Sequence, residues 1–155
     1  TPLYSSAASD VYKRQDLYAG TGALGLEALS RGASSTILVE SNKQAAAVCI
    51  KNARLIQDGL AEEDHEVRAK VQIQPVQKFL DSNSQVFDLV FIDPPYEISN
   101  QEVEKNLQSL LGSLSKDALV LVERSARAEA IATEGYELLE TKNFGDTAIY
   151  WLKPN

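Results

Sequence analysis

Short apolar runs alternate with segments of helical periodicity along the chain from Asp16 onward. The apolar runs are rich in Val, Ile, Leu and Phe, which is typical of strands buried inside a sheet. They occupy residues 36–39, 87–92 and 118–122. The helical segments between and before them occupy residues 23–31, 42–56, 76–80 and 102–114. Alternation of strand and helix favours an α/β fold with a parallel sheet.

The end of the chain departs from this alternation. Residues 136–142 and 147–152 form two consecutive strand patterns, joined through a turn at 143–146. With a first strand that runs into Asp16 and a further strand at 71–74, the chain is expected to contain seven strands. We predict a doubly wound, mostly parallel, Rossmann-like sheet with an antiparallel last strand. Ligands of such sheets bind beyond the carboxyl ends of the strands.

The first fifteen residues, TPLYSSAASDVYKRQ, show neither helical nor strand periodicity. The stretch SSAASDVYKRQ resembles translated sequencing-adapter sequence, and a short native tail is the alternative. Residues 1–15 are therefore expected to be a non-native or disordered leader, and residues 16–155 a single domain. The first strand is expected to be truncated, because it lacks apolar residues ahead of Asp16.

Composition restricts the class of protein further. A length of 155 residues suffices for one domain with a full core. No apolar run is long enough to cross a bilayer and no signal peptide is visible, so a cytoplasmic monomer without a membrane partner is expected. The single cysteine, Cys49, excludes an internal disulfide, and His65 has no ligand partners at metal-binding spacing, so no metal is expected. A net charge of −7 argues against a free nucleic-acid binder.

A glycine-rich segment, DLYAGTGALG, joins the first strand to the first helix. Gly20, Gly22 and Gly25 match the dinucleotide-binding pattern G-x-G-x-x-G. Glu40, at the end of the second strand, is placed to accept hydrogen bonds from ribose hydroxyls. These features indicate an adenosine-containing cofactor, either NAD or S-adenosylmethionine. A carboxylate at Asp16 suits the cationic amino-acid end of S-adenosylmethionine and would repel a pyrophosphate, which favours S-adenosylmethionine.

The tetrapeptide Asp93-Pro94-Pro95-Tyr96 follows the apolar run at 87–92. Neither proline has an N–H, so the backbone there presents carbonyl oxygens. A carboxylate and a carbonyl together form a cradle of two acceptors for an NH₂ group. Asp93 would stabilise the positive charge that develops on nitrogen during methyl transfer, and Tyr96 can stack on a flipped base. The pattern predicts methylation of an exocyclic amino nitrogen.

Three blocks in this order resemble the RsmD-type bacterial methyltransferases that modify guanine N2 in small-subunit ribosomal RNA. The blocks are DLYAGTGALGLEALSRGAS, VFIDPPY, and LVLVERS with KNFGDTAIYWL. The resemblance extends over residues 16–152 and implies S-adenosylmethionine as cofactor and 16S ribosomal RNA or the small ribosomal subunit as partner. The residues that it assigns to the cofactor are Asp16, Tyr18, Ala19, Gly20, Gly22, Glu40, Ser41 and Val76. Those that it assigns to the target amino group are Asp93, Pro94, Pro95 and Tyr96.

Two departures from the family pattern stand out. The family usually has an acidic residue for the adenine amino group after the third strand, where this chain has Pro75 and Val76. That change would remove a side-chain acceptor and leave the N–H of Val76 to bind the adenine. The family also begins with a basic β-hairpin and a helix, in place of which this chain has residues 1–15. Loss of that region would account for the acidic balance and would weaken the fold.

Other functions remain open from the sequence. The motifs also occur in variant form in methyltransferases that act on adenine N6 or cytosine N4 of DNA. An inactive fragment that binds only the cofactor is a further alternative, and an NAD-dependent oxidoreductase is a third. Arg124 and Arg127, after the run at 118–122, are expected to be solvated loop charges, and Cys49 is expected in the core.

Overall fold

The computed structural model describes residues 13–20, 22–30, 35–62 and 68–155. Residues 1–12 of the expected leader and His65 lie outside these ranges. The strands are β1 (Lys13–Leu17), β2 (Ser35–Val39), β3 (Arg68–Gln72), β4 (Phe87–Ile92), β5 (Leu114–Ser125), β6 (Tyr136–Phe144) and β7 (Thr147–Pro154). The helices are α2 (Ala23–Ser30), α3 (Lys43–Glu62), α4 (Val76–Ser82) and α5 (Asn100–Leu110), with a 3₁₀ turn, η1, at Leu111–Ser113.

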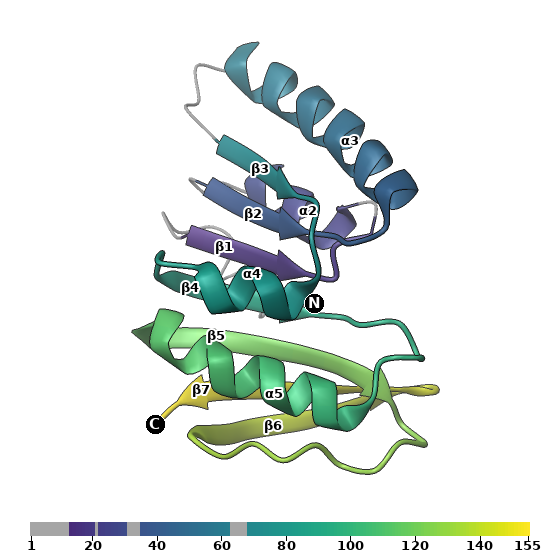
Figure 1. Ribbon diagram of the computed structural model, residues 1–155, viewed down its shortest axis with the longest axis vertical. Coiled ribbons are helices and arrows are strands. Elements are labelled where there is room, and N and C mark those ends of the chain that lie inside the picture. The colour runs from purple at the N-terminus through teal and green to yellow at the C-terminus, as the bar shows by residue number, and fades with distance from the viewer. Residues whose placement is uncertain (1–12, 21, 31–34, 63–67) are drawn as a thin grey trace.

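The strands form one seven-stranded sheet in the order β3-β2-β1-β4-β5-β7-β6 (Figure 1). The pairs β2–β3, β1–β2, β1–β4 and β4–β5 are parallel. β7 is antiparallel to both of its neighbours, because it closes a hairpin with β6 and inserts beside β5. The chain order reverses direction across the sheet between β1 and β4. The predicted doubly wound sheet with an antiparallel last strand is therefore confirmed.

Helices cover both faces of the sheet, and the alternation of side chains along each strand decides what they contact. In β2, Ile37 and Val39 point into the large core beneath α4 and α5. Leu38 points the other way, into a smaller cluster with Leu26 of α2 and Cys49 of α3. Cys49 is fully buried there, so its predicted place in the core is confirmed. Figure 1 shows α4 and α5 in front of the sheet and α2 behind it.

The start of β1 differs from the sequence-based expectation. The strand begins at Lys13, so residues 13–15 of the expected leader belong to the sheet and pair with β2. β1 has 5 residues, as do its neighbours on one side, β2 and β3. Arg14 and Gln15 are 1% and 0% exposed in the middle of the sheet. Strand pairing on both sides of β1 imposes this burial although both side chains are polar.

The polar segment at residues 57–69 is also partly regular. α3 continues to Glu62, and β3 begins at Arg68 rather than at residue 71. Asn42 caps α3, since its side-chain oxygen accepts a hydrogen bond from the N–H of Ala45 at 2.9 Å. The expected helix at 102–114 begins earlier and stops at Leu110, because Ser99 caps it and β5 starts at Leu114.

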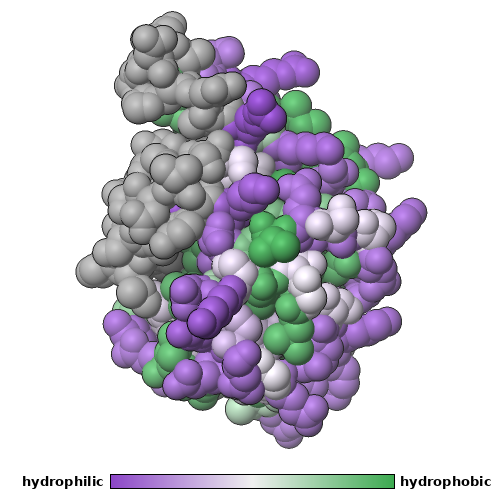
Figure 2. Space-filling view, turned by 90° about the vertical axis from the view of Figure 1, so that its left-hand side faces the viewer, coloured by the Kyte–Doolittle hydropathy of each residue, from purple (hydrophilic) through white to green (hydrophobic). Residues whose placement is uncertain are grey.

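Figure 2 shows the side of the molecule at which the parallel strands begin, opposite the ends that carry the predicted motifs. Its visible surface is mainly hydrophilic, with a small hydrophobic group near the centre. In the part of the chain that the structure describes, no helix is both long and apolar enough to cross a membrane.

Candidate active site

The turn between β1 and α2 has an unusual backbone. Tyr18, Gly20 and Gly22 have φ angles of 62°, 59° and 88°. These values lie in the left-handed region, which residues other than glycine rarely adopt. The turn is tied to the sheet by a hydrogen bond from the N–H of Ala19 to the carbonyl of Val39, at 2.9 Å. The glycines therefore meet a backbone requirement of this turn.

Asp16 lies at the base of the turn and is 2% exposed. Its Oδ2 accepts a hydrogen bond from the backbone N–H of Gly25 at 3.0 Å. Burial raises the pKa of Asp16 to about 7, and the negative charges of Asp93 and Glu40 contribute in the same direction, while the Gly25 hydrogen bond opposes them. A buried carboxyl group with a raised pKa is suited to binding a cation, which would stabilise its charged form.

The carboxylate of Glu40, just after β2, is held from two sides. Oε1 accepts a hydrogen bond from the N–H of Gly20 at 2.7 Å, and Oε2 accepts one from the N–H of Asn42 at 2.8 Å. Each carboxylate oxygen retains a further lone pair. Glu40 is therefore fixed between the glycine turn and the start of α3, where it can accept hydrogen bonds from a ligand's hydroxyl groups.

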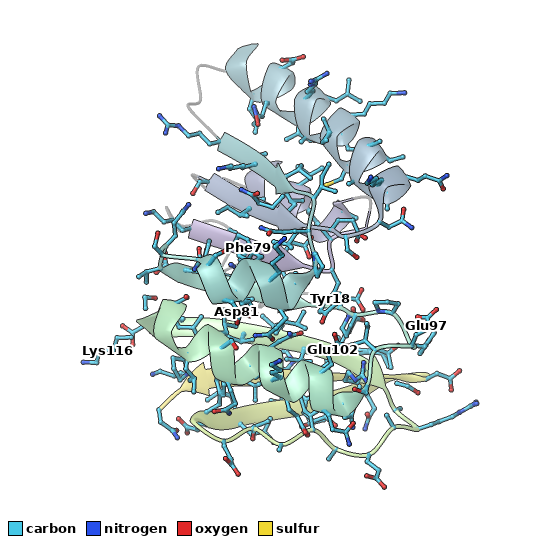
Figure 3. All side chains as sticks on the ribbon, viewed as in Figure 1. Tyr18, Phe79, Asp81, Glu97, Glu102 and Lys116 are labelled. Carbon is cyan, nitrogen blue, oxygen red and sulfur yellow. The ribbon has the colours of Figure 1, made fainter. Side chains whose placement is uncertain are left out.

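Tyr18 is held by a hydrogen-bond network that the sequence did not reveal. Its hydroxyl donates to Oδ1 of Asn106 at 2.5 Å, and Nδ2 of Asn106 donates to Gln77 at 2.8 Å. Burial, followed by the negative charge of Glu102, raises the pKa of Tyr18 to about 12. Figure 3 shows Tyr18 near Glu102 of α5, while Lys116 lies at the opposite end of the sheet. The strained turn is thus anchored to the helices on the α4–α5 face.

The segment Asp93-Pro94-Pro95-Tyr96 leaves β4 at the same edge of the sheet. Pro94 is buried, whereas Tyr96 is 84% exposed. The chain then turns through a hydrogen bond from the N–H of Ile98 to the carbonyl of Pro95, at 3.1 Å, and enters α5. Tyr96 therefore extends from a fixed turn with its ring accessible to a ligand.

Glu123, in β5, was not predicted as a site residue. Ile92 and Val122 are register partners in the parallel pair β4–β5, which places Asp93 and Glu123 beside each other one residue further on. The two carboxyl groups are close enough for each to affect the pKa of the other. Partial burial raises the pKa of both groups, of which Asp93 is the more exposed, and the charge of Asp93 also helps to raise that of Glu123, to about 7. The interaction with Glu123 opposes the rise in the pKa of Asp93, whereas the interaction with Asp93 raises the pKa of Glu123, which favours the proton on Glu123.

Arg124 does not have the role expected of it. It is only partly exposed, and its guanidinium donates to Oδ1 of Asn100 at 2.8 and 3.1 Å and to the carbonyl of Ile98 at 2.9 Å. It therefore ties β5 to the turn that follows the Pro-Pro pair. Arg127 is exposed, as predicted, with Asp146 at 3.5 Å.

A cavity of about 800 Å³ at the carboxyl edge of the sheet joins these groups. This volume is typical of sites for small molecules and cofactors. All the predicted site residues line it except Gly22 and Val76; those that do are Asp16, Tyr18, Ala19, Gly20, Glu40, Ser41, Asp93, Pro94, Pro95 and Tyr96. The lining residues that the sequence reasoning missed include Asn42, Ile98, Glu123, Arg124 and Thr147.

Gly22 and Val76, which do not line the cavity, lie in two different parts of the fold. Gly22 is the part of the turn that faces α3, where a Cβ atom would come within 2.8 Å of Sγ of Cys49. It therefore contributes to the shape of the turn and does not line the cavity. The side chain of Val76 packs into the large core at the start of α4. Among the residues that the structure describes, no group of three or more His, Cys, Asp or Glu side chains could hold a metal ion.

The chain is similar to known proteins over most of its length. A family model described as conserved hypothetical protein 95 matches residues 4–153. Ribosomal RNA small subunit methyltransferase D of Escherichia coli K12 is 35% identical over 108 residues, which cover 70% of this chain and 50% of that protein. Its counterpart in Haemophilus influenzae is 32% identical over 130 residues, which cover 84% of this chain and 65% of that protein. The chain thus spans about half to two thirds of the length of these relatives.

Solved structures show the same fold. A putative methyltransferase from Escherichia coli superposes with a TM-score of 0.81 at 26% identity, over 99% of this chain and 81% of that one. A putative methylase from Haemophilus influenzae superposes with a TM-score of 0.77 at 27% identity, over 98% of this chain and 93% of that one.

Proposed function

The chain belongs to the RsmD family of methyltransferases, whose model is described as conserved hypothetical protein 95, and from this we propose that it methylates the exocyclic N2 of a guanine in 16S ribosomal RNA with S-adenosylmethionine as methyl donor. The observation that carries this proposal is the meeting of Asp93-Pro94-Pro95-Tyr96 with Asp16 and Glu40 in one cavity. One half of the cavity suits the cofactor, and the other half suits an amino group.

The cofactor half supports S-adenosylmethionine over a dinucleotide. Asp16 and Glu40 both line the cavity beside the glycine turn. The raised pKa of Asp16 reflects a carboxyl group that gains from a nearby positive charge, such as the ammonium group of the cofactor. A pyrophosphate would add negative charge beside these acids. When bound, the cofactor supplies an electrophilic methyl group on a sulfonium.

The substrate half supports an amino acceptor. Asp93 provides carboxylate oxygens, and the prolines that follow it provide carbonyls without competing N–H groups. Together the carboxylate and carbonyl oxygens can accept hydrogen bonds from both N–H groups of an NH₂ group. The lone pair of the nitrogen is then held toward the methyl group. Asp93 would stabilise the positive charge that develops on nitrogen, and alignment of the two reactants would supply much of the remaining acceleration.

Tyr96 supports a base as the carrier of that amino group. Its ring is accessible at the edge of the cavity, where it can stack on a nucleobase that has left its helix. The names of the relatives, ribosomal RNA small subunit methyltransferase D, support ribosomal RNA as the source of this base. We propose 16S ribosomal RNA, free or within the small ribosomal subunit, as the partner.

Transfer of label from methyl-labelled S-adenosylmethionine to unmethylated small-subunit RNA, or to subunits that lack the modification, tests the proposal. We expect incorporation with the unchanged chain and a loss of about 100-fold or more with Asp93→Ala. Calorimetric titration with S-adenosylhomocysteine serves as the control that the variant keeps its cofactor site. Displacement of S-adenosylhomocysteine by NADH, with no transfer of label to RNA, would count against the proposal.

A further inference from the structure

The candidate active site holds a carboxyl pair that the motif alone does not explain. Asp93 belongs to the tetrapeptide after β4, whereas Glu123 comes from β5, thirty residues later in the chain. The parallel register of Ile92 with Val122 brings the next residue of each strand to the same edge of the sheet. Both side chains line the cavity. The pairing therefore follows from the register of the two strands, with Asp93 one residue beyond the end of β4.

Two adjacent carboxylates repel each other unless they share a proton. Asp93 and Glu123 lie beside each other at the ends of paired strands and line the same cavity, and their interaction raises the pKa of Glu123 and opposes the rise for Asp93, which favours Glu123 as the donor and Asp93 as the acceptor. Burial and the charge of Asp93 both favour the protonated form of Glu123. The pair thus carries a single negative charge, which resides mainly on Asp93.

The other charged groups that line the cavity do not neutralise the second carboxylate in place of this proton. Asp16 on β1 and Glu40 beyond β2 line the same cavity and are themselves acidic. Arg124, next to Glu123 in β5, directs its guanidinium to Asn100 and to the carbonyl of Ile98. In the described part of the chain, no ion pair between Glu123 and a cation is found.

A hydrogen bond from Glu123 would restrict the rotation of the Asp93 carboxylate. A carboxylate has about four lone-pair directions, so Asp93 can accept this bond and still accept from a substrate. We infer that Glu123 is a positioning residue: its protonated carboxyl group holds Asp93 in the orientation that accepts the target amino group. This inference rests on the proposed function, because it assigns Asp93 to that amino group.

The pair itself can be tested without methyl transfer. Carbon-13 NMR of the full chain with labelled glutamate carboxyl groups reports the titration of Glu123, which the spectrum of Glu123→Gln identifies. We expect Glu123 to titrate at a higher pH than exposed glutamates, and at a lower pH in Asp93→Asn than in the unchanged chain. Titration of Glu123 at the same pH with and without the Asp93 charge would overturn the inference and leave the proposed function standing.

The positioning role is tested by the pH profile of methyl transfer to small-subunit RNA. In the unchanged chain, kcat should fall on the alkaline side as Glu123 loses its proton. Glu123→Gln keeps a neutral donor, so this decline should be absent. Glu123→Ala should lower kcat by about tenfold at low pH, where the unchanged chain keeps the donor, and its profile should show no alkaline decline. Glu137→Gln, the same change at an exposed position on β6, should reproduce the profile of the unchanged chain.

The outcomes separate the two claims. Glu123→Gln covers the case in which Glu123→Ala does not fold, because it retains both the volume and the donor of the side chain. A profile of Glu123→Gln with the same alkaline decline, or activity as low as that of Glu123→Ala, would overturn the positioning role. No methyl transfer by the unchanged chain would overturn the proposed function and, with it, the substrate-facing part of this inference.

Discussion

Oδ2 of Asp16 lies 3.0 Å from the backbone nitrogen of Gly25 and accepts its hydrogen bond. Gly25 belongs to the first turn of α2, where backbone N–H groups have no partner within the helix. A Cβ atom at Gly25 would come within 3.1 Å of the Cβ of Asp16, so glycine permits this close approach. The last polar side chain of β1 thus joins the strand to the helix and is also one wall of the cavity.

Binding of the cofactor is expected to depend on pH through Asp16. The pKa of Asp16 is about 7, so its carboxyl group is charged above that pH and protonated below it. Because the charged form attracts the ligand's ammonium group, affinity for S-adenosylhomocysteine should rise as pH increases through about 7 and then level off. Calorimetric titration across this range measures the effect. Asp16→Asn should bind more weakly and without this rise, and a flat profile for the unchanged chain would contradict the assignment.

The stability of the ligand-free chain should change with pH in the opposite direction. The pKa of Asp16 is raised in the folded state from its ordinary value of 3.8 to about 7, so the folded state binds the proton more tightly than the unfolded state. Asp16 therefore contributes to the stability of the fold below about pH 4, and this contribution is lost as the pH rises to about 7.

Asp16→Asn should accordingly be more stable than the unchanged chain at pH 8, with a smaller difference at pH 5. The asparagine oxygen can still accept from Gly25, and the buried charge is removed. Urea unfolding at the two pH values, without ligand, gives the comparison. An equal difference at both pH values would show that Asp16 ionisation is not the cause.

Gly22 should tolerate no side chain. Its φ is +88°, and a Cβ atom would lie 2.8 Å from Sγ of Cys49. We expect Gly22→Ala to lower the free energy of unfolding by about 1–3 kcal/mol, through backbone strain and overpacking. Gly59→Ala is the matched control, because Gly59 lies in α3 with open space around its Cβ position. That change should be neutral or stabilising by up to about 1 kcal/mol. Equal effects at the two positions would contradict this explanation.

Gln15 should be a site at which an apolar residue stabilises the fold. It is fully buried in β1, in register with Ile37 and Val90 of the core beneath α4 and α5. Among the residues that the structure describes, neither its amide nitrogen nor its amide oxygen has a hydrogen-bond partner. Gln15→Met, of similar size, should raise the free energy of unfolding by about 1–3 kcal/mol.

Gln101→Met controls for the chemical change at an exposed position in α5. It should alter stability by less than about 0.5 kcal/mol. A loss of stability in Gln15→Met, measured by urea unfolding, would mean that the amide of Gln15 is stabilised by contacts other than hydrogen bonds.

Local sequence signals were enough to locate much of the fold. β4 was predicted at its observed bounds, since the apolar run of Phe87–Ile92 ends at residues that stop a strand. The turn at Gly20 and Gly22 was equally accessible, because glycines between a strand and a helix indicate left-handed backbone. In contrast, the start of β1 was missed. Arg14 and Gln15 carry no strand signal of their own, and pairing with β2 and β4 determines their burial.

The cavity residues that were named from the sequence lie in compact motifs. Glu123 and Arg124 were missed because their roles depend on contacts between distant segments. β5 extends to Ser125 by pairing with β7, and this pairing carries both side chains to the edge of the cavity. Arg124 was expected to be a solvated loop residue because its hydrogen-bond acceptors, Asn100 and the carbonyl of Ile98, are distant from it in the sequence. Long-range pairing of this kind leaves no local signature in a single sequence.

The position of the transferred methyl group tests the central claim most directly. Small-subunit RNA that has been incubated with the chain and S-adenosylmethionine can be digested to nucleosides and analysed by mass spectrometry. We expect N2-methylguanosine, and its loss with Asp93→Asn under conditions in which that variant still binds S-adenosylhomocysteine. Methylation of adenine or cytosine amino groups instead, or no methylated nucleoside from a chain that binds S-adenosylhomocysteine, would contradict the account.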